Sequence, residues 1–247
     1  MTTPPATTRR QLLRSAAASA ITLGFPTIIP ASALGKDGKP APSNRVTLGC
    51  IGVGGRGNED MRNFLNDDRV QIIAVADVDR GSDRYNKAIV KRFGNLGREP
   101  ARDNINKHYS TTGCATHGDF RELLARKDVD AVLIATPDHW HALQAIAAAR
   151  AKKHIYCEKP ISLTIEQGQV MARIVKESGV VWQTGSQQRS DIHFRMACEF
   201  VRNGRIGKLK SVRVGLASQN RDNNGNAARI APEPVPEGLD YAMWLGP

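Results

Sequence analysis

Aromatic side chains are scarce, since Phe, Trp and Tyr together make up 5% of the 247 residues. Proteins that bind single-stranded nucleic acid stack the bases on aromatic side chains, and this sequence gives no sign of such a platform. The formal net charge of +11 is spread along the chain and is not gathered into one basic block. Both observations favour a basic enzyme with small-molecule partners over a nucleic-acid-binding protein.

Cysteine is also scarce, and the spacing of the thiols excludes the usual cysteine frameworks. No two of them form a Cys-x-x-Cys pair, so neither a disulfide scaffold nor a zinc site is readable. The four are Cys50, Cys114, Cys157 and Cys198. His139 and His141 stand two residues apart but have no third ligand in register, and we predict no metal site.

A long hydrophobic run is missing as well. The segment 15–30 is moderately apolar, but Ser, Thr, Gly and Pro interrupt it, which makes it a poor transmembrane helix. It follows a segment around Arg9-Arg10 that resembles the twin-arginine export motif, and it precedes the small-x-small pattern Ala31-Ser32-Ala33. We therefore predict a signal peptide over 1–33 and a flexible linker over 34–44.

This predicted signal peptide implies a periplasmic or extracytoplasmic protein with no stable membrane insertion after cleavage of the signal. An uncleaved membrane anchor and a disordered tail are the alternatives. Twin-arginine export moves folded proteins, so a nucleotide cofactor loaded in the cytoplasm can travel with the chain.

The next segment carries the clearest chemical signal. The apolar run 46–51 predicts a buried parallel strand, and a Gly-x-Gly-x-x-Gly turn follows it directly. Such a turn lets the backbone approach a pyrophosphate, and the helix expected over 58–66 would direct its free N–H groups at the phosphates. The residues that we assign to this cofactor-binding turn are Gly52, Val53, Gly54, Gly55, Arg56 and Gly57.

Asp77 completes the nucleotide-binding pattern. It ends a second apolar strand, 20 residues after Gly57, where an acidic residue accepts hydrogen bonds from an adenosine ribose. Asp77 would repel the extra phosphate of NADP, although Arg80 could meet it, so NAD is favoured over NADP. The alternative is a glycine-rich surface turn beside a solvated aspartate.

Beyond Asp77, strands and helices alternate. The pattern predicts helices over 83–93, 119–124, 142–151 and 165–178, strands over 130–135, 154–157 and 180–184, and a long loop over 94–110. This alternation indicates an α/β fold with a Rossmann doubly wound parallel sheet, which binds ligands at the carboxyl ends of its strands. We assign residues 45–186 to this NAD(P)-binding domain.

The pattern changes after Gly185. A helix is expected over 190–203, a half-solvated strand over 208–216, a loop over 219–237, and the start of another element from Asp240. One strand cannot form a second sheet. We therefore expect 187–247 to be the beginning of an α+β C-terminal substrate and oligomerisation domain, truncated in this sequence.

Four motifs together carry a family resemblance. The glycine turn, Thr136-Pro137-x-x-x-His141, Glu158-Lys159-Pro160 and the closing sequence 244–247, Trp-Leu-Gly-Pro, resemble those of the Gfo/Idh/MocA oxidoreductases. These are enzymes of the glucose–fructose oxidoreductase and inositol dehydrogenase type. The resemblance covers residues 45–247 and is closest to exported bacterial members. It implies a Rossmann domain followed by a domain with a large, mostly antiparallel sheet.

The resemblance also implies roles for single residues. Thr136, Pro137 and His141 would line the cofactor cleft, and Glu158 would lie near the nicotinamide. Lys159 would bind the cofactor and act as the catalytic residue, between the nicotinamide ribose and the substrate hydroxyl. A hydroxyl that gives up a hydride must also lose its proton, so a base beside it is required.

Two further residues follow the last predicted strand. Gln188 and Arg189 stand where members of this family often reach the substrate, and we name them as candidate substrate contacts. A role with no contact to the substrate is equally consistent with the sequence. The histidine and aspartate that commonly share the catalytic task in this family come from the second domain, and no residue here matches them.

The function implied is hydride transfer between NAD, or NADP, and a sugar, polyol or related hydroxyl compound. The full-length protein is expected to be a homo-oligomer. One alternative is an NAD-dependent glycosidase that acts by transient oxidation, a branch that tends to lack the lysine at position 159. The other is a fragment that binds nucleotide without turnover.

Overall fold

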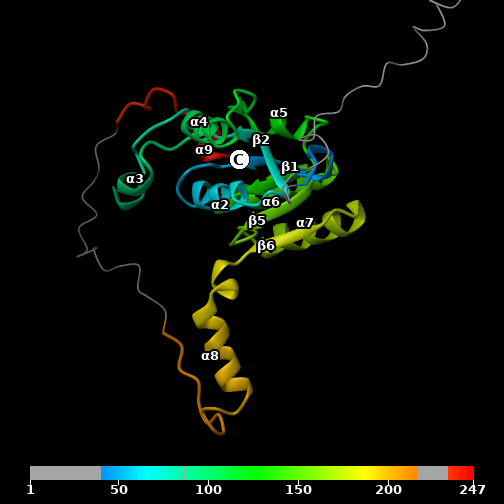
Figure 1. Ribbon diagram of the computed structural model, residues 1–247, viewed down its shortest axis with the longest axis vertical. Coiled ribbons are helices and arrows are strands. Elements are labelled where there is room, and N and C mark those ends of the chain that lie inside the picture. Colours follow the sequence, from blue (N-terminus) through cyan, green and yellow to red (C-terminus); the bar gives the residue numbers. More distant parts are fainter. Residues whose placement is uncertain (1–39, 86, 216–232) are drawn as a thin grey trace, which may run out of the picture. The chain divides into compact units, whose positions relative to one another are not determined.

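The computed structural model describes residues 40–85, 87–215 and 233–247 (Figure 1). The predicted signal peptide and residues 34–39 of the predicted linker lie outside these ranges. The chain divides into one unit that ends at Arg45 and another that runs from Val46 to Pro247. In the first unit, Pro42–Asn44 form one 3₁₀ turn.

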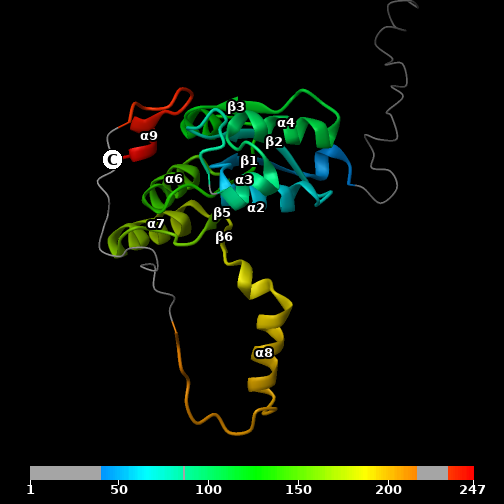
Figure 2. The ribbon, with the colours of Figure 1, turned by 90° about the vertical axis from the view of Figure 1, so that its left-hand side faces the viewer.

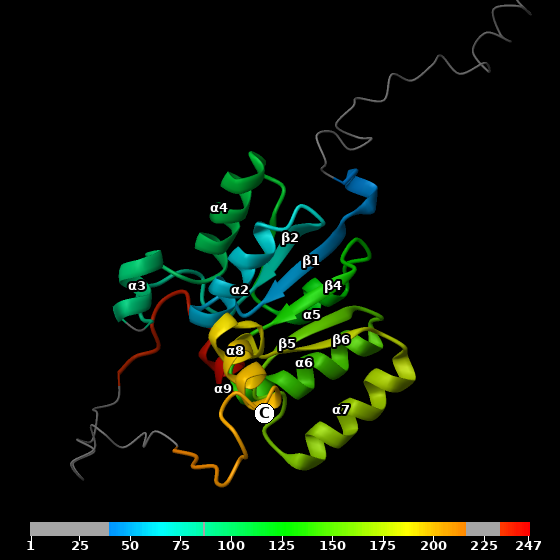
Figure 3. The same ribbon diagram turned by 60° about the horizontal axis from the view of Figure 1, so that its bottom comes forward.

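The second unit is built on a parallel sheet. Within the described residues the sheet has six strands in the order β3-β2-β1-β4-β5-β6, and each pair of neighbours is parallel (Figure 3). This confirms the predicted doubly wound Rossmann fold. The strands are β1 (Val46–Ile51), β2 (Val70–Ala76), β3 (Ala115–His117), β4 (Ala131–Ile134), β5 (His154–Glu158) and β6 (Trp182–Gly185). The short strand β3 was not predicted, because three residues are too few to show an alternating pattern.

Helices cover both faces of this sheet. The described helices are α2 (Gly55–Leu65), α3 (Lys87–Phe93), α4 (Arg98–Tyr109), α5 (Phe120–Leu124), α6 (Asp138–Arg150), α7 (Ile165–Ser178), α8 (Ile192–Arg202) and α9 (Tyr241–Leu245). One core cluster joins the sheet to α2 and α4 through Met61 and Ile105. The other joins it to α5, α6 and α7 through Leu123, Ala145 and Met171.

Helices α6 and α7 lie side by side on the second of these faces (Figure 3). Ala142, Ala145 and Ala148 of α6 are fully buried, and their small side chains let the helix approach its neighbours closely. Helix α7 has clear boundaries. The Thr164 side chain accepts a hydrogen bond from the Gln167 N–H at its start, and Gly179, with φ of 69°, ends it.

The predicted loop over 94–110 is wrong, because helix α4 occupies most of it. Ala101, Ile105 and Tyr109 recur every four residues, and Ala101 and Ile105 are buried in the core cluster of α2 and α4. This apolar stripe is one residue wide in a polar segment, so it was overlooked.

Two other expectations need correction. Helix α3 begins at Lys87 and not at Asp83. The strand predicted over 208–216 is also wrong, because residues 208–215 do not pair with any described strand. An isolated strand has no partner for its backbone N–H and C=O groups, so the alternating pattern alone could not produce one. Most of the predicted loop over 219–237 lies outside the described residues.

The C-terminal segment returns to the Rossmann unit. The Arg80 N–H donates to the Gly238 carbonyl (2.8 Å), and the Asp240 N–H donates to the Val78 carbonyl (3.1 Å). Helix α9 consequently lies beside the beginning of α6 (Figure 2). Among the described helices, none combines the length and the apolar character that a membrane crossing needs.

Candidate functional site

The glycine turn between β1 and α2 has the geometry that requires glycine. Gly52 has φ of +79°, and an added Cβ would lie 2.8 Å from the Thr136 backbone nitrogen. A Cβ at Gly57 would collide with the Gly52 carbonyl oxygen. Gly54 precedes α2 and has no side chain with which to cap it, so no side-chain cap occupies the first N–H groups of the helix. This arrangement is suited to a phosphate.

Asp77, at the carboxyl end of β2, is held rigidly by the same turn. Its Oδ2 accepts a hydrogen bond from the Val53 N–H (2.7 Å), and its Oδ1 accepts one from the Asp79 N–H (2.9 Å). Burial raises the pKa of Asp77 to about 6, and these two N–H groups act against that shift. The carboxyl is therefore mostly ionised at neutral pH and can accept hydrogen bonds from a ligand hydroxyl.

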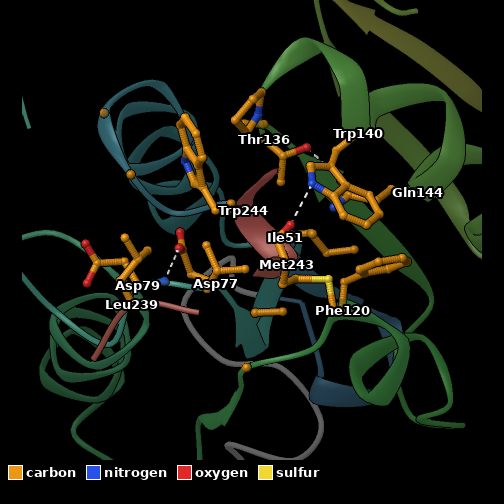
Figure 4. A pocket seen from close by; sticks show the side chains of 18 of the residues that line it. Ile51, Asp77, Asp79, Phe120, Thr136, Trp140, Gln144, Leu239, Met243 and Trp244 are labelled. Carbon is orange, nitrogen blue, oxygen red and sulfur yellow. Dashed lines mark hydrogen bonds between the residues drawn. The ribbon is translucent and has the colours of Figure 1, made fainter. Parts of the chain in front are cut away.

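A cavity of about 450 Å³ lies at the carboxyl ends of β1, β2 and β4 (Figure 4). This volume is within the usual range for small-molecule sites. The structure brings six of the predicted residues together in its lining: Gly52, Gly54, Gly55, Asp77, Thr136 and Pro137. The glycine turn and the anchored carboxylate thus face one cavity, and they fit the phosphates and ribose of a dinucleotide.

Part of the wall comes from the C-terminal segment. Leu239, Met243 and Trp244 line the cavity, and Leu239 lies beside Asp79 (Figure 4). Helix α9 is held there by the Trp140 Nε1–H, which donates to the Met243 carbonyl (2.9 Å), and by a His139 ring nitrogen 3.0 Å from the Trp244 carbonyl. Sequence reasoning noted the closing Trp-Leu-Gly-Pro motif but assigned it no place in this cavity.

Gln144 is another lining residue that the sequence did not single out. It accepts a hydrogen bond from the Thr136 hydroxyl (2.7 Å) and is 3% exposed. Its neighbours in α6 are mostly alanines, and the one glutamine in this alanine-rich helix could have been identified from the sequence as a candidate site residue. The hydrogen bond fixes the orientation of Thr136 at the end of β4.

Tyr85 and Ile89 cover the open face of the glycine turn. A Cβ built on Gly54 would lie 2.5 Å from Cε1 of Tyr85, and one built on Gly55 would lie 2.9 Å from Cδ1 of Ile89. Burial and the nearby carboxylates of Asp77 and Asp79 raise the pKa of Tyr85. Tyr85 therefore borders the space that a pyrophosphate would approach.

The basic residues near this end are already paired. Arg80 forms an ion pair with Glu99 (2.7 Å) and is not among the lining residues of the cavity. Arg84 does line the cavity and lies 3.3 Å from Oδ1 of Asp79. The predicted meeting of Arg80 with a 2′-phosphate therefore has no support from the placement of this side chain.

The residues predicted at the nicotinamide end lie elsewhere. Lys159 is exposed at the end of β5, and the Lys159–Pro160 peptide bond is cis. His141 is 1% exposed, and its Nδ1 lies 2.5 Å from the Pro160 carbonyl oxygen, so it supports the residue after Lys159 and does not line the cavity.

Arg56, Glu158 and Gln188 belong to a different part of the unit. The guanidinium of Arg56 turns away from the first cavity and contacts Glu158, which is 3% exposed. Arg56 and Gln188 line a second cavity of about 590 Å³, and Arg189 is exposed beside it. The roles predicted for these residues toward cofactor and substrate stay predictions.

Comparison with known proteins agrees with this geometry. The model of the GFO_IDH_MocA family, described as an oxidoreductase family with an NAD-binding Rossmann fold, matches residues 46–186. A myo-inositol 2-dehydrogenase of Thermotoga maritima is 32% identical over 201 residues, which are 81% of this chain and 49% of that protein. A glycosyl hydrolase family 109 protein of Shewanella putrefaciens is 30% identical over 219 residues, covering 81% of this chain and 44% of that protein.

Solved structures share the fold. Scyllo-inositol dehydrogenase from Lactobacillus casei, with bound NAD(H) and scyllo-inositol, superimposes with a TM-score of 0.52 at 24% identity. The match covers 66% of this chain and 43% of that one. The chain spans about half the length of the curated relatives it matches.

Proposed function

The chain belongs to the Gfo/Idh/MocA oxidoreductase family, and on this premise we propose that it binds NAD for hydride transfer to or from a hydroxyl carbon of a sugar, polyol or related compound. The observation that carries the proposal is the pairing of the glycine turn with the anchored carboxylate of Asp77 in one cavity. The family is NAD-binding, and the paired state of Arg80 supports NAD over NADP.

The residues of this chain would divide the work between binding and chemistry. The N–H groups at the start of α2 would hold the pyrophosphate, and Asp77 would accept the ribose hydroxyls. When bound, NAD supplies the acceptor for a hydride. Lys159 would hold or take the proton of the substrate hydroxyl at its Nζ atom, which is exposed at the end of β5 and free to meet a substrate.

The substrate class rests on the relatives. Myo-inositol 2-dehydrogenase and levoglucosan dehydrogenase are among the proteins that this chain resembles, and their names give a cyclic polyol and an anhydrosugar. We therefore expect a carbohydrate or polyol with adjacent secondary hydroxyl groups.

To test this function, NADH formation from NAD is measured by absorbance with inositols, anhydrosugars and aldoses as candidate substrates. We expect turnover with at least one of them, and a loss of about 10²- to 10⁴-fold in Lys159→Met, because a positioned acid or base contributes that much to a proton transfer. Arg189→Met, at an exposed position near the same end, is the comparison variant for candidate substrate contacts. Full turnover by Lys159→Met would contradict the role of the lysine.

A second function is favoured by one observation, the likeness to a glycosyl hydrolase family 109 protein. Such an enzyme would oxidise and re-reduce its substrate on retained NAD and cleave a glycosidic bond with no net redox change. Release of a chromogenic aglycone without added cofactor would favour this function. No release, together with NADH formation on free polyols, would favour the dehydrogenase.

We propose in addition that the protein is exported by the twin-arginine route. Support comes from Arg9-Arg10 and the small residues at 31–33, both outside the described residues. A fusion of 1–45 to a folded reporter should reach the periplasm and begin near Leu34, and the Arg9→Lys, Arg10→Lys double variant should stay in the cytoplasm. Equal export of both fusions would contradict the proposed twin-arginine signal. The homo-oligomer implied by the resemblance is a further proposal, checked by light scattering of the purified protein.

A further inference from the structure

A buried charge cluster links helix α2 to the end of β5. The guanidinium of Arg56 contacts three carboxyl groups through three different nitrogens: Nε lies 3.3 Å from Oε1 of Glu158, Nη1 lies 3.1 Å from Oε2 of Glu59, and Nη2 contacts Oδ1 of Asp60. Asp60 and Glu158 are each 3% exposed. Two carboxyl groups are thus removed from water around one guanidinium.

The hydrogen bonds of Asp60 are incomplete unless it carries a proton. Its Oδ2 is buried and has no hydrogen-bond partner among the described residues. Burial raises the pKa of Asp60 to about 7, Arg56 lowers it, and the neighbouring Glu158 raises it through its charge and through a side-chain hydrogen bond between the two carboxyl groups. Two carboxylate oxygens both accept, so a bond between them requires a proton on one.

The other elements packed around Asp60 add no compensating charge. Strand β5 contributes Tyr156 beside Glu158, and the pKa of that phenol is raised by burial and by both carboxyls. Strand β1 contributes Cys50, whose fully buried thiol has its pKa raised by burial. Among the described residues facing the pair, Arg56 is the cation that meets both carboxyls.

The cluster also reaches the proposed catalytic lysine. Oε2 of Glu158 accepts a hydrogen bond from the backbone N–H of Lys159 (3.3 Å). Room for the Glu158 carboxyl is provided by Gly185, where a Cβ would lie 2.5 Å from Oε1. The glutamate therefore stands between α2, which begins at the glycine turn, and the residue that would carry the chemistry.

We propose that Asp60 is a positioning residue, which shares one proton with Glu158 and, with Arg56, fixes the end of β5 and Lys159 relative to the glycine turn. This inference rests on the proposed function for its effect on turnover, but the shared proton itself does not. Loss of that proton above neutral pH leaves two ionised carboxyls on one guanidinium, which weakens the link.

The principal variant is Asp60→Asn, which keeps the shape and permanently offers Glu158 an N–H donor. A group whose pKa is raised in the folded state stabilises the protein below its unfolded pKa and loses this contribution as the pH rises through the folded value. The wild-type thermal midpoint, measured without cofactor, should therefore fall by about 3 °C or more between about pH 6 and about pH 9 relative to that of Asp60→Asn. Asp103→Asn, at an exposed position on α4, is the matched control and should follow the wild type.

Infrared spectroscopy of the wild type gives a second readout. The wild type should show the band of a protonated carboxyl at about pH 6.5 that disappears by about pH 9. Because Asp77 titrates nearby, the band is assigned by its persistence in Asp77→Asn and its absence from Asp60→Asn. No such band in the wild type, or an unchanged pH slope in Asp60→Asn, would overturn the proposal.

Turnover then tests the link to Lys159. With an active substrate, wild-type kcat should fall several-fold at alkaline pH, and Asp60→Asn should lose this decline while KM for the substrate stays the same. An identical alkaline decline in both proteins would overturn the positioning role. If the band and the melting slope appear but no substrate is turned over, the proposed function fails and the shared proton is still supported.

Discussion

The carboxyl ends of the strands form one edge of the sheet, and the two halves of this edge differ in structure. Where β1 and β2 end, the glycine turn, the anchored Asp77 and helix α9 enclose a cavity. Where β5 and β6 end, Lys159 and Arg189 are exposed, and the ordered feature is the charge cluster buried behind them. The described unit therefore places the glycine turn and Asp77 around one cavity, whereas at the end proposed to carry the reaction it fixes the backbone of Lys159 and leaves its side chain exposed.

The largest effect is expected from the turn itself. Gly57→Ala would place a Cβ against the Gly52 carbonyl, and overpacking of backbone against backbone costs about 1–3 kcal/mol or more. We expect a lower thermal midpoint and NADH binding weakened at least tenfold, measured by calorimetry and fluorescence titration. Gly113→Ala, where the nearest atom would be 3.5 Å away, is the control and should behave as the wild type. The same thermal midpoint and the same NADH affinity in the two variants would contradict the role of the close backbone approach at Gly57.

A pH series should separate the two ends. Asp77 has a raised pKa near 6, so as the pH falls from about 7 to about 5 it is protonated, and NADH affinity should drop about tenfold. Over the same range the free protein should gain stability from this residue, because a raised folded pKa favours the protonated folded state. Asp77→Asn should lose the affinity trend and show a smaller gain in stability, because the raised pKa of Asp60 still contributes to that gain. Affinity that is flat with pH in the wild type would contradict the assignment.

Helix α9 should contribute less than the turn. Trp244→Ala removes one wall of the cavity, and we expect NADH binding to weaken by about three- to tenfold, since aromatic contacts contribute about 0.5–1.5 kcal/mol. Leu245→Ala, which changes an exposed neighbour outside the cavity, is the control. Identical affinities for the two variants would remove α9 from the binding site.

The smallest effect on binding is expected at the reacting end. Lys159→Met should change NADH affinity by less than about threefold, because an exposed charge makes a small contribution to binding. A large loss of affinity would show that the two ends are not separate and that Lys159 mainly holds the cofactor. Fluorescence titration with NADH measures this directly.

The sequence predicted the binding end better than the rest. The glycine turn and Asp77 are 20 residues apart within one strand–helix–strand unit, so local patterns were sufficient to place them. Helix α4 was missed because its apolar stripe is narrow. The walls from Met243 and Trp244 could not be found, because they depend on contacts with residues about one hundred positions earlier, such as Trp140.

The charge cluster illustrates a second limit. Arg56 was predicted to bind cofactor because it lies in the glycine turn, but its guanidinium faces Asp60 and Glu158. Asp60 carries no motif, and nothing in its sequence neighbours indicates burial next to another carboxyl. Such pairs become visible only when helix α2 is packed against strand β5.

The most direct test of the account is a fluorescence titration of the wild type and Asp77→Asn with NADH and NADPH. We predict saturable NADH binding to the wild type, weaker NADPH binding, and a loss of NADH affinity of about ten- to 100-fold in Asp77→Asn, as expected for hydrogen bonds to a charged group. Tight NADH binding by both proteins, or none by a folded wild type, would contradict the claim that the glycine turn and Asp77 form a nucleotide site.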